Sequence, residues 1–291
     1  MEIIKNKKIW FAISGIIMVL GLIFAILNGL NFGIDFTGGS LLEIDLHEEL
    51  PVTEIREITN QYDSDASISL LGEEKSIVQI RSMHDFDSET RMQIFNQFKE
   101  KYNLEETQPL QAEQFGPSIG KEIKTKAIIS MIIASIGMLI YISYRFELRF
   151  GLAALLALLH DVFIVIAMYS VFRIPINSPF VAAILTILGY SINDTIVIFD
   201  RIRENIKIMR KSSFAEIADE SIRQTLMRSI NTSITTLLTV LVLYLLGVEQ
   251  VKVFALPLII GIVAGTYSSV LIAPSLWVIL KEKQEKRLML S

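Results

Sequence analysis

The segment Leu188-Gly-Tyr-Ser-Ile-Asn-Asp-Thr-Ile-Val-Ile-Phe-Asp-Arg-Ile-Arg-Glu-Asn205 decides how this chain folds. Its first part continues an apolar run, so that residues 180–199 form a stretch of about 20 residues, which is the length of a helix that crosses a membrane. Asn193 and Asp194 interrupt that run. An ionisable group inside a span costs about 2.5–3.5 kcal/mol on translocon scales, so its presence needs a reason. The segment predicts a transmembrane helix that carries a functional carboxyl group.

Further apolar blocks flank this segment on both sides. Together with residues 180–199 they make six candidate spans, and the other five are residues 9–30, 127–144, 150–172, 230–247 and 253–280. The composition agrees, because 52% of the 291 residues are hydrophobic, which exceeds the usual share in soluble proteins. Lysines precede the first block as in a signal peptide, but the block is too long and no cleavage site follows it. We therefore expect an uncleaved membrane anchor.

The positive residues indicate the orientation of the spans. Cytoplasmic loops carry an excess of Lys and Arg. Of the Lys and Arg that lie in short loops and chain ends, nearly all fall on one side: Lys5, Lys7, Lys8, Arg145, Arg149, Arg201, Arg203, Lys207, Arg210, Lys211, Arg223, Arg228, Lys281, Lys283, Lys286 and Arg287. The short loops of the other side carry Arg173 and Lys252. Both termini are therefore expected in the cytoplasm, and residues 31–126 are expected outside.

Residues 31–126 have the pattern of a small folded domain between the first span (residues 1–30) and the remaining five (residues 127–291). Alternation and helical spacing predict the strands 40–46, 66–71, 76–81 and 107–114 and the helices 52–61 and 87–102. The resulting order, β-α-β-β-α-β, is the ferredoxin-like pattern. The predicted fold class is a six-helix all-α membrane bundle with an extracytoplasmic α+β domain.

A charged cytoplasmic loop is expected at about residues 200–229. Ser213 and Glu216 have the spacing of a capping box, and the apolar residues that follow have helical spacing. They predict an amphipathic helix that lies on the membrane surface or against the bundle.

Asp194 is the leading candidate for proton transport. Desolvation favours the neutral form of a buried carboxyl group, so this group can take up and release a proton. Arg228 opens the fifth span at a depth that permits pairing with Asp194. The alternative for Asp194 is a static interhelical contact, which an Asn would provide at lower cost. The alternative for Arg228 is an interfacial side chain that extends to the cytoplasm.

His160 and Asp161 are two further polar residues inside a span. Histidine titrates near neutral pH, so the pair is suited to a proton relay. A buried hydrogen-bonded pair without a transport role explains the same residues equally well. The sequence leaves the two interpretations open.

Two groups of glycines have structural explanations. Asp35, Gly38 and Gly39 follow the first span, where glycines permit tight turns, so they are expected to form a corner between helix and domain. Gly261 and Gly265 form a G-x-x-x-G motif in the last span, which permits close helix packing.

Several classes of function find no support in the sequence. The chain has no cysteine and three scattered histidines, so no metal site or cysteine nucleophile is expected. No basic stripe with aromatic residues points to nucleic acid. Residues 116–121, GPSIGK, are one residue short of a phosphate loop, and Glu122 replaces its Ser or Thr. We expect neither a cofactor nor an enzymatic site.

Five segments together resemble the SecF family of protein-export membrane subunits: residues 31–39, 160–162, 189–205, 224–233 and 265–269. The resemblance implies one half of a resistance-nodulation-division-type transporter in the bacterial cell (inner) membrane, paired with SecD and associated with the SecYEG channel. It implies that the proton-motive force drives late stages of preprotein translocation. In that family the Asp of the fourth-span motif and the Arg that opens the fifth span are implicated in proton transport, which corresponds to Asp194, preceded by Asn193, and Arg228.

Two other functions remain as alternatives. One is half of a proton-driven exporter of small molecules or lipids, which predicts an apolar pocket in the outer domain. The other is a scaffold for the channel that transports nothing, for which Asp194 would be dispensable.

Overall fold

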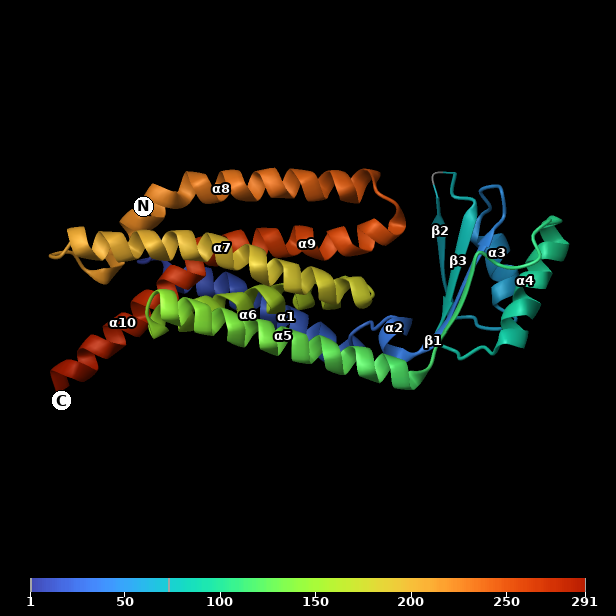
Figure 1. The fold of residues 1–291 in the computed structure, drawn as a ribbon, viewed down its shortest axis with the longest axis horizontal. Coiled ribbons are helices and arrows are strands. Elements are labelled where there is room, and N and C mark those ends of the chain that lie inside the picture. Colours follow the sequence, from blue (N-terminus) through green and yellow to red (C-terminus); the bar gives the residue numbers. More distant parts are fainter. Residues whose placement is uncertain (1, 73, 291) are drawn as a thin grey trace.

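The computed structural model describes residues 2–72 and 74–290, apart from the side chains of residues 117, 249, 250 and 286–290. Lys286 and Arg287, which entered the charge argument, thus lie outside the described side chains. A long helical bundle carries a small α/β domain at one end, and both chain termini lie at the opposite end (Figure 1). Among the described residues, six helical segments are long and apolar enough to cross a membrane.

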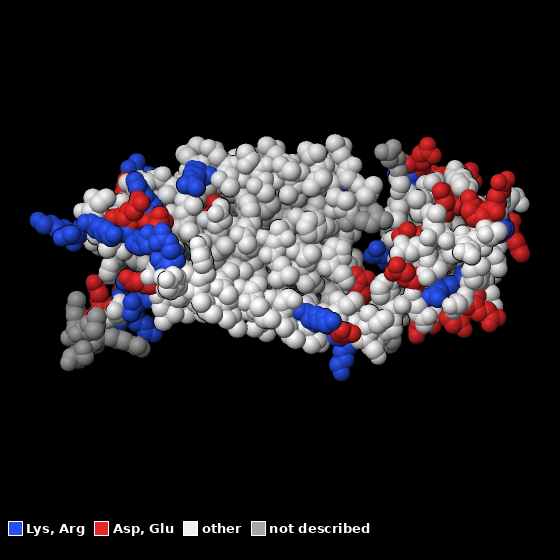
Figure 2. Space-filling model, in the orientation of Figure 1, with Lys and Arg blue, Asp and Glu red and all other residues white. Residues whose placement is uncertain are grey.

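The six predicted spans are confirmed, with longer helices than the apolar blocks alone indicated. The first five spans are α1 (Lys7–Asn28), α5 (Pro117–Arg145), α6 (Leu148–Val171), α7 (Ser178–Ile208) and α8 (Phe214–Leu246). The sixth consists of α9 (Glu249–Tyr267), the π-helical turn η1 (Ser268–Ile272) and α10 (Ala273–Leu290). Figure 2 shows a wide band almost without charge across the middle of the bundle, with charged residues concentrated at its two ends.

Helix α6 forms the centre of the bundle. It packs against α1, α5 and α9, and 61% of its most apolar window is buried, compared with 11% for α1. Ala153, Ala154 and Ala157 are nearly inaccessible, because small side chains let neighbouring helices approach closely. The polar residues His160 and Asp161 therefore lie on one of the most enclosed helices, while much of α1 faces outward.

The structure differs from the expected loop at residues 200–229. Helix α7 continues to Ile208 and α8 begins at Phe214, so residues 209–213 alone connect two long helices. Ser213 and Glu216 do form a capping box, but the helix that it starts continues into the fifth span. The apolar stripe of its first turns, with Ile217 and Ile222, is buried against the bundle. No break separates that stripe from the apolar span, so the two form one helix.

The last spanning segment changes direction at η1, where α10 diverges from α9 (Figure 1). A π-helical turn inserts an extra residue into the helical repeat and is a recognised cause of kinks. Ser268 and Ser269 lie in this turn, and both are fully buried. The apolar pattern of the last span gave no indication of the bend.

The domain has the predicted order of elements. Its strands and helices are β1 (Gly39–Asp45), α3 (Val52–Thr59), β2 (Ser67–Leu71), β3 (Ile77–Ser82), α4 (Ser88–Tyr102) and β4 (Gln111–Phe115). The antiparallel sheet has the order β2-β3-β1-β4, which a ferredoxin-like fold requires. Helices α3 and α4 cover the sheet face that points away from the bundle (Figure 1). The short helix α2 (Ile34–Thr37) connects α1 to β1.

An exposed histidine joins two loops of this domain. His47 Nε2 lies 2.6 Å from Glu106 Oε1, and this hydrogen bond, with the charges of Glu106, Asp45 and Glu105, raises the pKa of His47 above its usual 6.5. A raised pKa in the folded state stabilises the contact fully below the unfolded pKa, and the effect is lost as the pH rises through the folded pKa.

We therefore predict a pH-dependent protection of the two loops that contain His47 and Glu106. Hydrogen exchange of the full chain, corrected for intrinsic rates, should show more protection near residues 47 and 106 at about pH 6 than at about pH 8. His47→Gln should remove this difference, because glutamine does not titrate. An equal pH dependence in the variant would contradict the assignment to His47.

Candidate functional site

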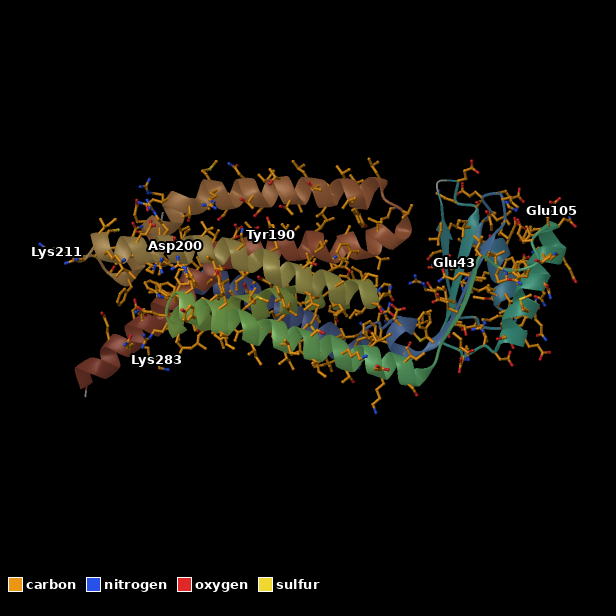
Figure 3. The ribbon with its side chains drawn as sticks, viewed as in Figure 1. Glu43, Glu105, Tyr190, Asp200, Lys211 and Lys283 are labelled. Atoms are coloured by element: carbon orange, nitrogen blue, oxygen red, sulfur yellow. The ribbon has the colours of Figure 1, made fainter. Side chains whose placement is uncertain are left out.

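Asp194 lies on α7, between Tyr190 and Asp200, which Figure 3 labels along that helix. It is 3% exposed. Its carboxyl Oδ2 accepts a hydrogen bond from Ser233 Oγ of α8 at 3.4 Å. Ser233 Oγ lies 2.6 Å from Thr266 Oγ1 of α9, and Thr266 donates to the Ile262 carbonyl at 2.7 Å. A chain of hydroxyl groups thus connects the buried carboxyl group to two neighbouring helices.

The charge state of Asp194 decides the direction of these hydrogen bonds. An ionised carboxylate accepts only, so Ser233 must give it its single hydrogen and then accept from Thr266. A protonated carboxyl group can donate to Ser233, which then donates to Thr266, and Thr266 keeps its bond to the Ile262 carbonyl. Uptake of one proton therefore reverses the direction of the hydrogen bonds that join α7, α8 and α9.

His160 and Asp161 form a second buried cluster on α6. His160 Nδ1 lies 3.0 Å from Asp161 Oδ1, and His160 Nε2 lies 2.8 Å from Ser14 Oγ of α1. The His160 ring stacks on that of Tyr267, with centroids 6.0 Å apart. Ser191 of α7 donates to Asp161 Oδ2 at 2.6 Å. The pair thus joins α1, α6, α7 and α9, as both interpretations of the sequence allow.

The hydroxyl groups of Ser269 in η1 and Thr195 in α7 lie between the clusters. Ser269 Oγ donates to the Ser191 carbonyl at 3.2 Å, and it lies 2.8 Å from Thr195 Oγ1. Thr195 directly follows Asp194 in the chain. Asp161 and Asp194 are therefore connected through one short segment of α7 and through η1, and the polar groups form one buried polar layer inside the bundle.

The glycines of the last span let α9 lie close to α7. A Cβ atom at Gly261 would overlap the side chain of Ile187, and one at Gly265 would lie 3.0 Å from the Ser191 Cβ. Small residues at membrane helix interfaces permit such approach. The close contact brings Ser191 and Ser269 within hydrogen-bond distance, so the predicted packing motif also positions the polar layer.

Arg228 and Asn193 lie outside this layer. Arg228 is exposed and lines a cavity of about 530 Å³ at the end of the bundle near the termini, between α5, α7 and α8. Its guanidinium group acts on Asp194 through space, but no hydrogen bond or ion pair joins the two among the described residues. The proposed pair is therefore not formed in this conformation. Asn193 is exposed, although it directly precedes the buried Asp194 on α7.

The residues of the predicted corner connect the bundle to the domain. Asp35 lies in α2, and its Oδ2 accepts a hydrogen bond from the Ser178 amide at 2.7 Å, at the first residue of α7. Gly38 and Gly39 have φ angles of +84° and +141°, which favour glycine. A Cβ atom at Gly39 would also overlap the Ser82 carbonyl of β3. These residues turn the chain from α2 directly into the first strand.

Sequence reasoning missed the hydroxyl groups that surround the two carboxyl groups. They are Ser14, Ser191, Thr195, Ser233, Thr266, Tyr267 and Ser269. Ser and Thr in spans commonly bond their own backbone, as Thr232 does with the Arg228 carbonyl, so residue type alone does not separate the two cases. All of them except Ser14 lie in the segments 189–205, 224–233 and 265–269 that resemble the SecF family, and that resemblance was the available signal.

Two family models match this chain. The model described as "Protein export membrane protein SecD/SecF, C-terminal" matches residues 94–283, which is more than half of the chain. The model of the "SecD/SecF GG Motif" matches residues 23–48, where Gly38 and Gly39 lie.

Relatives and a solved structure agree with these matches. The protein translocase subunit SecF of Calditerrivibrio nitroreducens is 38% identical, over 98% of this chain and 99% of its own. The protein translocase subunit SecDF of Bacillus subtilis is 35% identical over 97% of this chain and 38% of its own. The crystal structure of SecDF from Thermus thermophilus matches with a TM-score of 0.85 and 33% identity, over 97% of this chain and 39% of that one. The chain spans less than two fifths of these SecDF proteins. It belongs to the SecD/SecF family of protein-export membrane proteins, and within that family it is a SecF-type subunit.

Proposed function

We propose that this SecF-type subunit uses the proton-motive force to assist late stages of preprotein translocation through the SecYEG channel. The observation that carries the proposal is the Asp194 carboxyl group, buried in the bundle and hydrogen-bonded through Ser233 to a hydroxyl chain between three helices. One elementary charge that crosses the membrane potential yields about 2.3 kcal/mol per 100 mV. Energy of this size biases a two-state conformational equilibrium.

Proton binding and release at Asp194 is the step that changes the conformation. When the carboxyl group is protonated, the hydroxyl chain through Ser233 and Thr266 satisfies it without a cation. When it is ionised, the positive charge that acts on it among the described residues is that of Arg228, which lines a cavity at the end of the bundle near the termini. Alternation between these states changes the packing of α7 against α8. Because α7 starts at the linker to the α/β domain, the change reaches the domain that handles the emerging preprotein.

The distribution of charge supports an inner-membrane protein with both termini in the cytoplasm. Figure 2 shows a dense group of Lys and Arg at the bundle end that holds the termini, whereas acidic residues dominate the domain at the other end. Positive loops stay cytoplasmic, so the domain lies outside the cytoplasm. That placement matches a role on the side where preproteins emerge.

The interior of the domain offers no support for the exporter alternative. Ile55, Val78 and Phe98 have no exposed surface, and together with their neighbours they fill the space between sheet and helices. An exporter of small molecules or lipids would need an apolar pocket there.

SecD is the proposed partner within the membrane, and the exposed polar residues of α7 and α8 support it. Asn193 is exposed on α7, and Asn231, Thr235 and Thr239 are exposed on α8. A Cβ atom at Gly189 would meet no other atom within 4 Å. Small and polar residues are typical of helix interfaces in membranes rather than of lipid contacts. We infer that the membrane helices of SecD cover these exposed polar positions of α7 and α8.

Cross-linking tests the partner directly, because the chain has no cysteine of its own. Asn193→Cys should form cross-links with cysteines placed along the membrane helices of SecD. Ile16→Cys is the matched control, since Ile16 is 61% exposed on α1, a helix that packs mainly against α6. Equal cross-linking from both positions, or none from Asn193→Cys, would argue against this interface.

The proton-driven function is tested by late-stage export in membrane vesicles, measured with and without a proton gradient, for the wild type and for Asp194→Asn. A gradient effect that survives in the variant would remove the proposal.

A further inference from the structure

The linker between α1 and the domain is bound to the segment that precedes α7. The Gly33 amide donates to the Ile176 carbonyl at 2.9 Å, and the Ile176 amide donates to the Asn31 carbonyl at 2.7 Å. These backbone bonds hold residues 31–33 beside the loop that leads into α7. The domain is therefore attached to the start of the helix that carries Asp194.

The first turn of α7 takes its cap from this linker rather than from its own N-cap residue. Asn177 occupies the N-cap position with an extended backbone, but its side chain makes no capping bond. Instead, the Ser178 amide donates to Asp35 Oδ2 at 2.7 Å. Asn is among the best N-cap residues, so the use of Asp35 in its place needs an explanation.

The Asn177 side chain is buried and unsatisfied in this arrangement. It is 4% exposed, and neither its Oδ1 nor its Nδ2 atom has a hydrogen-bond partner among the described residues. Gly33 presses against it, because a Cβ atom at Gly33 would overlap Asn177 Oδ1. A buried amide without partners destabilises the state that contains it, so a different arrangement of the same residues would relieve this cost.

We propose that α7 has two caps that are used in turn: Asp35 when the linker is docked, and Asn177 when the linker moves away. Departure of Gly33 frees the space beside Asn177, whose Oδ1 atom can then accept from the Phe180 amide at the N3 position, an amide that bonds the Asn177 carbonyl at 3.0 Å in the docked state. Pro179 between them has no amide hydrogen to offer. The start of α7 stays capped in both states, so the domain can leave and return without unwinding the helix.

The cap exchange links the proton site to the domain, and its purpose rests on the proposed function. Any shift of α7 caused by Asp194 changes the relative strength of the two caps. The exchange itself needs no proton gradient, so it can be measured separately.

Distances between domain and bundle test the exchange. Two spin labels are attached to Asn96→Cys on α4 and Val248→Cys at the α8–α9 turn, both exposed positions in a cysteine-free chain. Pulsed electron resonance on the full chain in liposomes, without a gradient, reports the docked and undocked populations. Removal of an N-cap typically costs about 1 kcal/mol, which changes the ratio of docked to undocked molecules about fivefold. Asp35→Ala should shift the ratio towards the undocked state, and Asn177→Ala should shift it towards the docked state.

Matched variants make the outcome decisive. Asp87→Ala removes the cap that Asp87 provides for α4 at the Thr90 amide, away from the linker, and should leave the distances unchanged. Asp35→Asn keeps an acceptor oxygen and should shift the ratio less than Asp35→Ala.

Unchanged distances in Asp35→Ala, or a shift of Asn177→Ala towards the undocked state, would overturn the proposal. If Asp35→Ala does not insert, Asn177→Ala alone still decides, because it leaves the docked cap intact. If gradient-dependent export is unchanged in Asp194→Asn, the proposed function is refuted, but the exchange of caps is not.

Discussion

Replacement of Asp194 by asparagine is expected to abolish the gradient-dependent part of preprotein export completely and to leave the gradient-independent part intact. Asparagine has nearly the same shape and can still bond Ser233, but it cannot change its charge. In vesicles that contain the full export machinery, the variant with a gradient should therefore export at the rate of the wild type without one. Thr186→Val is a suitable control on the same helix, because Thr186 is exposed and bonds only the Ala182 carbonyl.

Substitution of Arg228 separates charge from geometry in the same assay. Arg228→Gln removes the cation that acts on Asp194, so it should reduce the gradient effect, whereas Arg228→Lys keeps the charge and should retain more of it. If Asp194→Asn exports like the wild type under a gradient, the subunit acts as a scaffold, and the proton-transport mechanism is wrong.

Replacement of Gly261 by valine is expected to destabilise the bundle by about 1–3 kcal/mol, the usual cost of overpacking. Even a Cβ atom at this position overlaps the Ile187 side chain, and the larger side chain forces α9 away from α7. The melting temperature of the purified protein, followed by size-exclusion chromatography, should fall. Gradient-dependent export should fall with it, because the same contact aligns Ser191 with Ser269.

Two further variants test the physical reason for this effect. Ile187→Ala should partly rescue Gly261→Val, because it removes the atoms that the valine would displace. Gly15→Val on α1 should change the melting temperature little, because a Cβ atom there meets nothing within 4 Å. Equal destabilisation by Gly15→Val and Gly261→Val would show that helix-forming tendency, rather than the contact with α7, causes the loss.

Much of the fold was predictable because it depends on local properties of the chain. A membrane span needs only sufficient length and apolar character, and these are read directly from residues 180–199 and the other five blocks. The order of elements in the domain likewise follows from alternation and helical spacing, although β1 and β3 bury several consecutive residues rather than one face alone. The error at residues 200–229 arose because polar composition marked the end of a span, whereas the two helices continue into water at that end.

The candidate site was predictable in its ionisable residues and not in their partners. Asp194, His160 and Asp161 stand out because a charge in an apolar span is costly. Ser233 and Ser269 do not, since a serine in a span can equally bond its own helix. Their role depends on which helix lies opposite, and the pairing of α7 with α8 and α9 is a property of the assembled bundle.

The sequence by itself determined that this chain crosses a membrane six times, carries a ferredoxin-like domain and buries a carboxyl group in its fourth span. Each of these follows from the transfer of single segments between water and lipid, which depends on composition and order alone. The tertiary structure alone decided that Asp194 meets a hydroxyl chain rather than Arg228, that the last span bends at Ser268–Ile272, and that Asp35 caps α7 while Asn177 stays unpaired. Those features join residues far apart in the chain, and hydrogen bonds at 3 Å depend on how whole helices pack, which no local pattern encodes.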